Sequence, residues 1–344
     1  MNPSGRNCFR FREFSFTLPG DIYVRYQAFD NALELRGALL QKVPLKIDVG
    51  AVYNLSPRLS RTYPNDFTPQ QHELVFDIDI SDYDDVRNCC KEASICPKCW
   101  PFMKIGAKVL HSILTKEFGF RHLLFVFSGR RGFHCWVADR AARELSAEAR
   151  RAIGDYFSLI TGCMSMVKRV TLNPKHGIHP MVVKALEEID KEFDDLMVDK
   201  QDFLATDHLM QSVIDLCTDE NLQAKLSECK HRARTTSDRW KMMQLISRSF
   251  KGNKKNYLIQ EIKLQHCFPR IDANVTKGLN HLLKLPFCIH PKTGNVCVPI
   301  SIETIDSFDL LAVPNIKNMT KGSLDPYLKT MKNFVDAILE ASEN

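Results

Sequence analysis

The sequence lacks any long hydrophobic run. None of its 344 residues lies in an apolar segment approaching the roughly 20 residues that a membrane-spanning helix needs, and the longest candidates have the length of a strand. Residues 1–14 carry charge without an apolar stretch, so we expect no signal peptide there. Internal repeats and low-complexity segments are also lacking. With 44% hydrophobic and 26% charged residues, the composition predicts a globular protein and excludes a fibrous or disordered one.

A strong excess of charge of one sign is lacking too. Lys and Arg number 47 and Asp and Glu 41, a formal net charge of +6 that permits a nucleic-acid partner without requiring one. Cysteine, by contrast, is plentiful, with twelve residues. Because no export signal precedes them, six disulfides are not expected. We expect buried thiols, a metal site, or both.

Periodicity of apolar residues indicates a mixture of strands and helices. Alternation predicts strands at residues 9–16, 22–26, 45–49 and 74–80, in a first hundred residues made mainly of strands and turns. Helical spacing predicts helices at residues 102–114 and 145–160. Two apolar runs around a glycine-bounded turn predict a β-hairpin at residues 123–127 and 133–137.

The second half of the chain begins with a helical block. Residues 180–250 are rich in charge, contain no glycine and have helical periodicity, which is typical of a surface subdomain. Strand patterns return at residues 270–275 and 295–300, and the tail from about residue 319 is helical at best. The length therefore indicates about two domains, or one large domain with an insertion.

An acidic segment interrupts this basic sequence. Residues 72–85 hold six acids and no Lys or Arg. Asp77 and Asp79 are two apart on a predicted strand, so their carboxylates share a face, where they repel unless a cation lies between them. Mg²⁺ is the natural occupant, and Asp272 in another predicted strand would complete the carboxylates of a two-metal phosphoryl-transfer site. A solvated charge run on an exposed strand is the other interpretation.

A basic turn follows the strand at residues 123–127. Ser128, Arg130, Arg131 and His134 lie in a glycine-bounded segment whose backbone can approach a ligand closely and whose arginines match phosphate oxygens. Taken alone, an ordinary hairpin with exposed arginines explains it better. Together with the acidic strand it predicts the other half of a nucleotide site, with a positive wall that could be extended by His281, Lys284 and His290.

Four cysteines lie within eleven residues: Cys89, Cys90, Cys96 and Cys99. Four thiolates so close together match a structural tetrahedral zinc site, which has no open coordination position. A disulfide or a redox pair is the alternative, but the reducing compartment disfavours the first and the second needs only two cysteines. The remaining cysteines are expected to be buried thiols: Cys8, Cys135, Cys163, Cys217, Cys229, Cys267, Cys288 and Cys297.

Five long segments carry a resemblance to a known family: REFSFTLPGDIYVRYQ (12–27), ELVFDIDISDYDDVRNCC (73–90), ICPKCW (95–100), FSGRRGFHCWV (127–137) and CFPRIDANVTKGLNHLLKLPFCIHPKTG (267–294). In these segments, and in their order and spacing, the chain resembles the small catalytic subunit of eukaryotic-type DNA primases over roughly residues 11–314. The resemblance implies an α/β (α+β) archaeo-eukaryotic primase "prim" fold with a structural zinc motif. It divides the chain into a catalytic core at 1–178 with its zinc motif at 89–99, an inserted helical subdomain at 179–256, a second core part at 257–318 and a C-terminal tail at 319–344.

The resemblance also implies roles for individual residues. The metal-binding catalytic residues would be Asp77, Asp79 and Asp272, and Glu13 would matter for activity. The triphosphate would be held by Ser128, Arg130, Arg131 and His134, with His281, Lys284 and His290 nearby and Arg25 in the same pocket. The zinc ligands would be Cys89, Cys90, Cys96 and Cys99.

As a function, the resemblance implies synthesis of short RNA primers on single-stranded DNA from ribonucleoside triphosphates, with Mg²⁺ or Mn²⁺ in a two-metal site. A primase-polymerase or end-joining polymerase that uses deoxynucleotides, and a non-catalytic zinc-bearing scaffold, are the alternatives. The implied partners are a large primase subunit with an iron–sulfur cluster and DNA polymerase α with its accessory subunit, in the nucleus. Only eleven residues precede the first segment, so we expect helices that brace the core in the family to be missing here.

Overall fold

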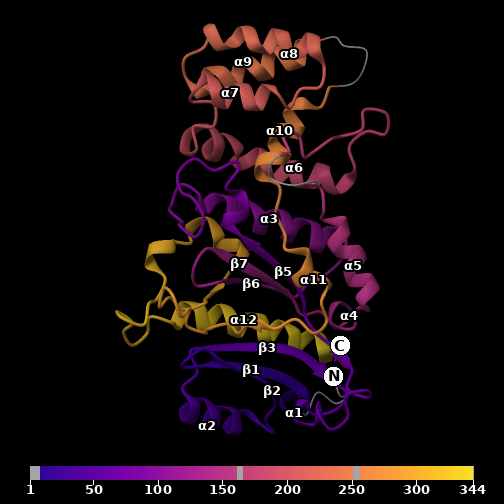
Figure 1. Ribbon diagram of the computed structural model, residues 1–344, viewed down its shortest axis with the longest axis vertical. Coiled ribbons are helices and arrows are strands. Elements are labelled where there is room, and N and C mark those ends of the chain that lie inside the picture. The colour runs from indigo at the N-terminus through magenta and orange to yellow at the C-terminus, as the bar shows by residue number, and fades with distance from the viewer. Residues whose placement is uncertain (1–7, 161–165, 251–255, 344) are drawn as a thin grey trace. The chain divides into compact units, whose positions relative to one another are not determined.

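The computed structural model describes residues 8–160, 166–250 and 256–343 (Figure 1). The backbone forms two compact units. Unit 1 comprises Met1–Asp77, Phe120–Tyr156 and Asp272–Asn344, and unit 2 comprises Ile78–Gly119 and Phe157–Ile271. The fold is mixed α/β with two antiparallel sheets, as expected. Within the described ranges, no helix has both the length and the apolar character needed to span a bilayer.

The first sheet belongs to unit 1 and has the strand order β2-β1-β3-β4, with β8 pairing with β3. Its strands are β1 (Arg12–Leu18), β2 (Ile22–Gln27), β3 (Lys46–Tyr53), β4 (Pro69–Gln71) and β8 (Leu283–Lys284). The second sheet has the order β5-β7-β6-β9. It contains β5 (Leu74–Asp79), β6 (Leu123–Phe127), β7 (Gly132–Val137) and β9 (Pro299–Ile300). The predicted hairpin is confirmed, with Leu123 opposite Val137 and Phe127 opposite Phe133.

The core of unit 1 gathers apolar side chains from both sheets. Phe14 and Phe16 project from one face of β1, and Val126 and Trp136 come from the hairpin. The helices are α1 (Cys8–Phe11), α2 (Ala32–Lys42), α4 (Arg140–Arg143), α5 (Ala147–Tyr156), α11 (Ala273–Lys277) and α12 (Asp325–Glu343). Three 3₁₀ turns complete it: Pro57–Leu59, Ile302–Ser307 and Leu310–Ala312.

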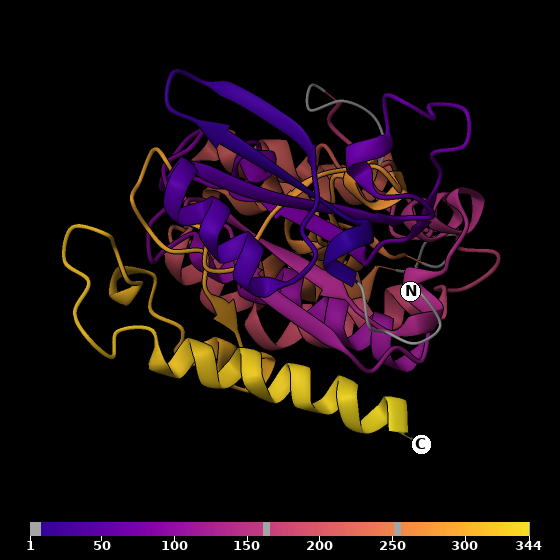
Figure 2. The same ribbon diagram turned by 90° about the horizontal axis from the view of Figure 1, so that it is seen from below.

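The tail is a 19-residue helix, α12, which the sequence pattern describes only in outline. It contacts β6 and β9 and is drawn in yellow in Figures 1 and 2. Met331 and Phe334 are three residues apart, so they share a helix face, and both pack against the unit 1 core. Leu328 and Leu339 remain about half exposed.

Unit 2 is almost wholly helical. Its α-helices are α3 (Trp100–Lys116), α6 (Pro180–Phe193), α7 (Asp207–Ile214), α8 (Glu220–Ser227), α9 (Thr236–Ser249) and α10 (Leu258–Cys267). Helix α3 packs against α6 and α10, and α8 packs against α7 and α9 (Figure 1). Short 3₁₀ helices span Ile80–Tyr83 and Glu228–His231. A π-helix, η3 (Asp194–Lys200), continues α6, and the predicted helical pattern of residues 180–250 is thereby confirmed.

An aromatic cluster fixes the chain after this π-helix. The Trp240 ring lies 5.1 Å from that of Phe193 and 5.5 Å from that of Phe203, between ring centroids. The Trp240 indole N–H donates to Asp194 Oδ1 at 3.0 Å. Helix α9 is therefore tied to both ends of η3, which defines the path of the residues that follow.

Several sequence predictions are wrong at the level of single elements. The strand predicted at 9–16 begins only at Arg12, because Cys8–Phe11 forms a helical turn. The helix predicted at 145–160 is shorter, Ala147–Tyr156. No strand forms at 270–275: Ile271 makes one isolated bridge with Ile78, and the chain then turns into α11.

Other elements have signals that alternation does not detect. Helix α2 lies among the predicted strands and turns, and the Asn31 side chain caps it by accepting from the Glu34 N–H at 3.0 Å. At 295–300 only Pro299–Ile300 is a strand, while Asn295 and Val296 form single bridges. The proposed limits of the helical subdomain stay a prediction.

Candidate active site and cysteine cluster

Two of the predicted carboxylate residues are joined directly by their backbones. The Asp272 N–H donates to the Asp77 carbonyl at 3.0 Å, so residues from distant parts of the sequence meet in unit 1. Phe76 and Ile78 flank Asp77 and are fully buried, whereas Asp77 itself is half-buried. Asp272 is exposed and caps α11, with its carboxylate accepting from the Asn274 N–H at 2.9 Å. The predicted strand around Asp272 is thus replaced by a helix N-terminus, which still presents the carboxylate.

Asp79 is the last residue of β5 and belongs to unit 2. Alternation along the strand places its side chain on the same strand face as that of Asp77. Its Oδ1 accepts from the Ser81 N–H at 2.9 Å and from the Ser81 hydroxyl at 2.8 Å. These bonds orient the carboxylate at the point where the strand becomes a 3₁₀ helix.

The predicted basic turn is a tight connection between β6 and β7. The Ser128 N–H donates to the Gly132 carbonyl at 2.9 Å, and the Gly132 N–H donates to Ser128 Oγ at 3.1 Å. Arg130 and Arg131 lie half-buried at its tip. Gly129 has φ +84°, and a β-carbon there would lie 2.7 Å from the His290 β-carbon. The turn therefore requires glycine both for its backbone and for its contact with His290.

His134 connects the turn to the carboxylates. It is 8% exposed on β7, and its Nε2 lies 3.7 Å from Asp77 Oδ1. Burial, followed by the positive charges of Lys284, Lys46 and His281, lowers its pKa to about 3. The neutral ring therefore lies between an acidic and a basic cluster.

Two of the downstream basic residues, Lys284 and His290, lie beside the same turn. Lys284 lies opposite Asp48 in the β3–β8 pair, and its Nζ donates to the Ser128 carbonyl at 3.2 Å. Burial lowers the pKa of Lys284. Burial, then Lys284 and Arg130, lowers the pKa of His290 to about 4. His281 has its pKa lowered by burial as well, although Asp272 opposes the shift. Groups that can carry positive charge are thus crowded together, and a bound polyanion would favour their protonated forms.

Sequence reasoning missed two charged residues of this cluster. Lys46 and Asp48 form an ion pair at 2.9 Å on β3, and Asp48 is 1% exposed. Lys46 is among the charges that lower the pKa of Lys284 and His290. Their spacing repeats that of Asp77 and Asp79, so the same alternation rule could have found them.

Glu13 serves as a buried hydrogen-bond acceptor. It is 0% exposed and accepts from Arg25 Nε at 3.0 Å and Arg25 Nη2 at 3.2 Å. The Tyr26 N–H and the Tyr53 hydroxyl also donate to it, each at 3.2 Å. Its oxygens are therefore occupied by groups of the protein, and it fixes the position of the partly exposed Arg25. Burial, then the Glu13 charge, raises the pKa of Tyr53.

The four clustered cysteines meet in unit 2 in a geometry that fits one metal ion. All four sulfur atoms lie within 4.8 Å of one another, and those of Cys96 and Cys99 are 3.8 Å apart. Zn–S bonds of about 2.3 Å in a tetrahedron require S···S distances of about 3.8 Å. Burial opposes ionisation of Cys96, but hydrogen bonds from Cys90 and from nearby backbone N–H groups lower its pKa to about 7. The donor set and its spacing therefore suit a structural zinc ion.

The other described cysteines are buried thiols, as expected: Cys135, Cys217, Cys267, Cys288 and Cys297. Burial raises the pKa of Cys297 to about 12, which keeps it protonated. Cys163 and the side chains of Cys8 and Cys229 lie outside the described part of the chain.

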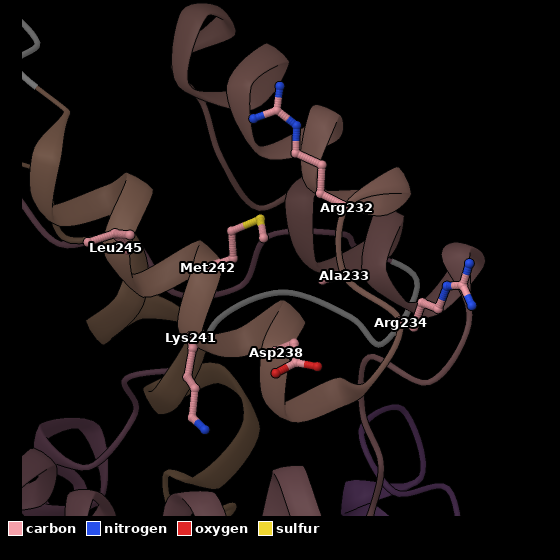
Figure 3. A pocket seen from close by; sticks show the side chains of 7 residues that line it. All are labelled: Arg232, Ala233, Arg234, Asp238, Lys241, Met242 and Leu245. Atoms are coloured by element: carbon pink, nitrogen blue, oxygen red, sulfur yellow. The ribbon is translucent and has the colours of Figure 1, made fainter.

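A cavity of about 530 Å³ lies in unit 2, between α9 and the segment that precedes it (Figure 3). It is lined by Arg232, Ala233, Arg234, Asp238, Lys241, Met242 and Leu245. None of the predicted catalytic or nucleotide-binding residues lines it. The charged candidate site of unit 1 is therefore a different feature.

Comparison with known proteins identifies the class to which this chain belongs. The family model described as DNA primase small subunit matches residues 76–302. A DNA primase small subunit of Drosophila melanogaster is 38% identical, over 96% of this chain and 78% of its own length. One of Schizosaccharomyces pombe is 39% identical, over 92% of this chain and 72% of its own length. The DNA primase small subunit PriS of Archaeoglobus fulgidus is 25% identical, over 88% and 76%.

The chain therefore belongs to the DNA primase small subunit family. The resemblance inferred from the five sequence segments is confirmed. The match includes the acidic strand from Phe76, the cysteine cluster and the hairpin.

Proposed function

We propose that this chain is a catalytic DNA primase subunit, a nucleotidyltransferase that makes short RNA primers on single-stranded DNA. The observation that carries the proposal is the backbone bond between Asp272 and Asp77, beside His134. It brings carboxylates next to the cationic turn, as transfer of a nucleotide from a triphosphate requires. Family membership supports the same reaction class.

Divalent ions would be held by Asp77, Asp79 and Asp272. Asp77 and Asp79 lie on β5, and Asp272 caps α11. When bound, Mg²⁺ or Mn²⁺ would supply activation of the attacking hydroxyl and neutralisation of charge on the phosphates. Oxygen donors of this kind suit both ions. His134, whose Nε2 lies 3.7 Å from Asp77 Oδ1, would orient the Asp77 carboxylate.

The cations would bind the triphosphate. Arg130 and Arg131 offer planar forks to phosphate oxygens, and Lys284 and His290 offer a second wall. The pKa values of Lys284 and His290 are lowered, and an incoming polyanion would stabilise the protonated forms of these two side chains. Binding and orientation, rather than covalent chemistry, would thus be the contribution of these side chains. Arg25, held by Glu13, would belong to the same pocket.

We further propose a heteromeric setting. The relatives are named small subunits, which supports a large subunit as partner and template DNA as substrate. DNA polymerase α with its accessory subunit, an iron–sulfur cluster carried by the large subunit, and a nuclear location follow from the family resemblance. Zinc in the cysteine cluster would be structural, because four thiolates leave no open position.

A priming assay on single-stranded poly-dT tests the proposal. With Mn²⁺ or Mg²⁺ and ATP, the full chain, alone and with the large subunit, should make short RNA products. dATP in place of ATP distinguishes a primase from a deoxynucleotide-using polymerase of the same fold. Failure to bind Mn²⁺ with nucleotide, together with absent synthesis, would favour the non-catalytic scaffold instead.

A further inference from the structure

Gln201 is a buried polar residue with an unusual set of partners. It is 1% exposed, and it follows the π-helix η3 in unit 2. Its Nε2 donates to Cys89 Sγ at 3.4 Å and to the Lys98 carbonyl at 2.7 Å. One amide group therefore contacts both a predicted zinc ligand and the turn between the last two ligands.

The contact with the cysteine loop is reciprocal. The Asn88 N–H donates to Gln201 Oε1 at 2.7 Å, and Asn88 Nδ2 donates to the Gln201 carbonyl at 3.0 Å. The side-chain oxygen and nitrogen of Gln201 thus both form hydrogen bonds with a loop about a hundred residues away in sequence. These two bonds between Asn88 and Gln201 are not part of a helix or a sheet, and they connect the cysteine loop to the end of η3.

The π-helix explains how Gln201 reaches this position. The Gln201 N–H donates to the Leu196 carbonyl at 2.9 Å, a bond that spans five residues. A π-helical turn inserts an extra residue relative to an α-helix and shifts the side chains that follow. Phe203, two residues after Gln201, packs against Trp240 in the aromatic cluster. This contact restrains the position of Gln201.

A buried arginine supports the loop from inside. Arg87 is 0% exposed and donates to the Ser94 and Glu92 carbonyls, each at 2.7 Å. Its Nη1 lies 3.9 Å from Cys99 Sγ. Hydrogen bonds to sulfur stabilise thiolates, and such outer contacts orient metal ligands. Cys89 and Cys99 thus each have a donor from outside the ligand set.

We propose that Gln201 is a positioning residue of the zinc site, which fixes the Cys89 sulfur and the 88–98 loop from the helical segment. The proposal rests on the proposed zinc site. Integrity of the metal centre then depends on the path of η3, and the helical block is more than a surface addition. Loss of an outer-shell contact of this kind lowers metal affinity by about 10- to 100-fold.

The test measures zinc release from the full chain into a colorimetric chelator, together with zinc content and thermal unfolding. Gln201→Ala removes every side-chain bond, and Gln201→Glu keeps the oxygen that accepts from Asn88 but loses both donated bonds. Both variants should release zinc at least about tenfold faster than the unaltered chain.

Gln265→Ala is the matched control. Gln265 is 7% exposed in the same unit, and its side chain accepts from the Arg169 N–H and donates to the Val167 carbonyl, both at 2.8 Å. Neither of these partners of Gln265 is a cysteine. Its variant should lower thermal stability without faster release. Equal acceleration by Gln265→Ala, or unchanged release from Gln201→Glu, would overturn the role of Gln201. Absence of zinc from the unaltered protein would instead overturn the zinc site itself.

Discussion

The cysteine cluster and the cationic turn differ in how the protein satisfies their charges. Around the cysteines, Gln201 and Arg87 donate to sulfur, and the four ligands already have the spacing of a single ion. Around the turn, burial lowers the pKa of Lys284 and of His290, and the charge of Lys46 adds to both shifts. The first arrangement suits a permanently bound ion. Under the proposed function, the second suits an anion that is exchanged at each turnover.

The largest effect is expected at Asp77. Asp77→Asn should reduce primer synthesis by about 10³-fold or more, because loss of metal-stabilised charge costs several kcal/mol in the transition state. Thermal unfolding and zinc content should stay unchanged, which would separate the two sites functionally. Extension of a poly-dT-directed primer by ATP, followed on gels, measures it.

Asp155→Asn is the control, since Asp155 is exposed in unit 1 and forms an ion pair with Lys277. Synthesis by Asp77→Asn within twofold of the unaltered chain would contradict the assignment.

The next largest effect is expected at the proposed zinc site of unit 2. Cys99→Ser should abolish stoichiometric zinc and destabilise the protein by several kcal/mol, because metal binding contributes directly to folding. Elemental analysis and urea unfolding measure both effects. Cys135→Ser, at an equally buried thiol of unit 1, should retain zinc. Zinc lost equally from both variants would mean that general instability, not ligation, is the cause.

A smaller effect is expected at Glu13. Glu13→Gln removes the charge that pairs with Arg25 while keeping the shape, so the free energy of unfolding should fall by about 1–3 kcal/mol. Urea titration measures it. Glu34→Gln is the matched control, because its ion pair with Arg58 is exposed and screened by solvent, so its loss should have a smaller effect. An equal effect of the two substitutions would argue against a special role for the buried pair.

The smallest effect is a pH dependence. His134 and His290 have native pKa values of about 3 and about 4, below the ordinary value of 6.5. Their unfolded forms therefore bind protons first, so stability should fall as pH decreases from about 6.5 toward 4. Tripolyphosphate should reduce this loss, because an anion beside His290 favours its protonated form.

Thermal unfolding at pH 7 and pH 5, with and without tripolyphosphate, measures the effect. His290→Gln should weaken the response to the anion. His266→Gln should leave it intact, since His266 has a similarly low pKa in unit 2. An anion response that is the same in all three proteins would show that the turn is not its origin.

Local patterns predicted much of this fold because they report local physics. Alternation found β2 and β5, two apolar runs around a glycine-bounded turn found the hairpin, and helical spacing found α3. Capping was the missed signal: Asn31 starts α2, and Asp272 starts α11 where alternation predicted a strand. Short polar side chains at such positions compete with strand pairing by binding their own backbone.

The chemistry of the side chains was enough to select the candidate residues. It was not enough to predict which of them lie close together in the folded protein. That Asp272 bonds to Asp77, or that Gln201 contacts Cys89, depends on the path of the long intervening segments. The alternation rule could have predicted that Lys46 and Asp48 share a strand face. Nothing in the sequence of that strand indicates that it pairs with the strand of Lys284. Long-range contacts of this kind have no local signature.

Unit 1 is built from three separate segments of the chain, and this affects how the protein folds during its synthesis. Strands β8 and β9 complete the two sheets, and Asp272 meets Asp77 only after residues 78–271 have been made. During synthesis, β3 and β6 are made long before their partners β8 and β9. Bringing such distant segments together costs loop-closure entropy, which slows folding. Until β8 has been made, β3 lacks its partner at Asp48 and Val49, and an unpaired strand edge of this kind favours aggregation during synthesis.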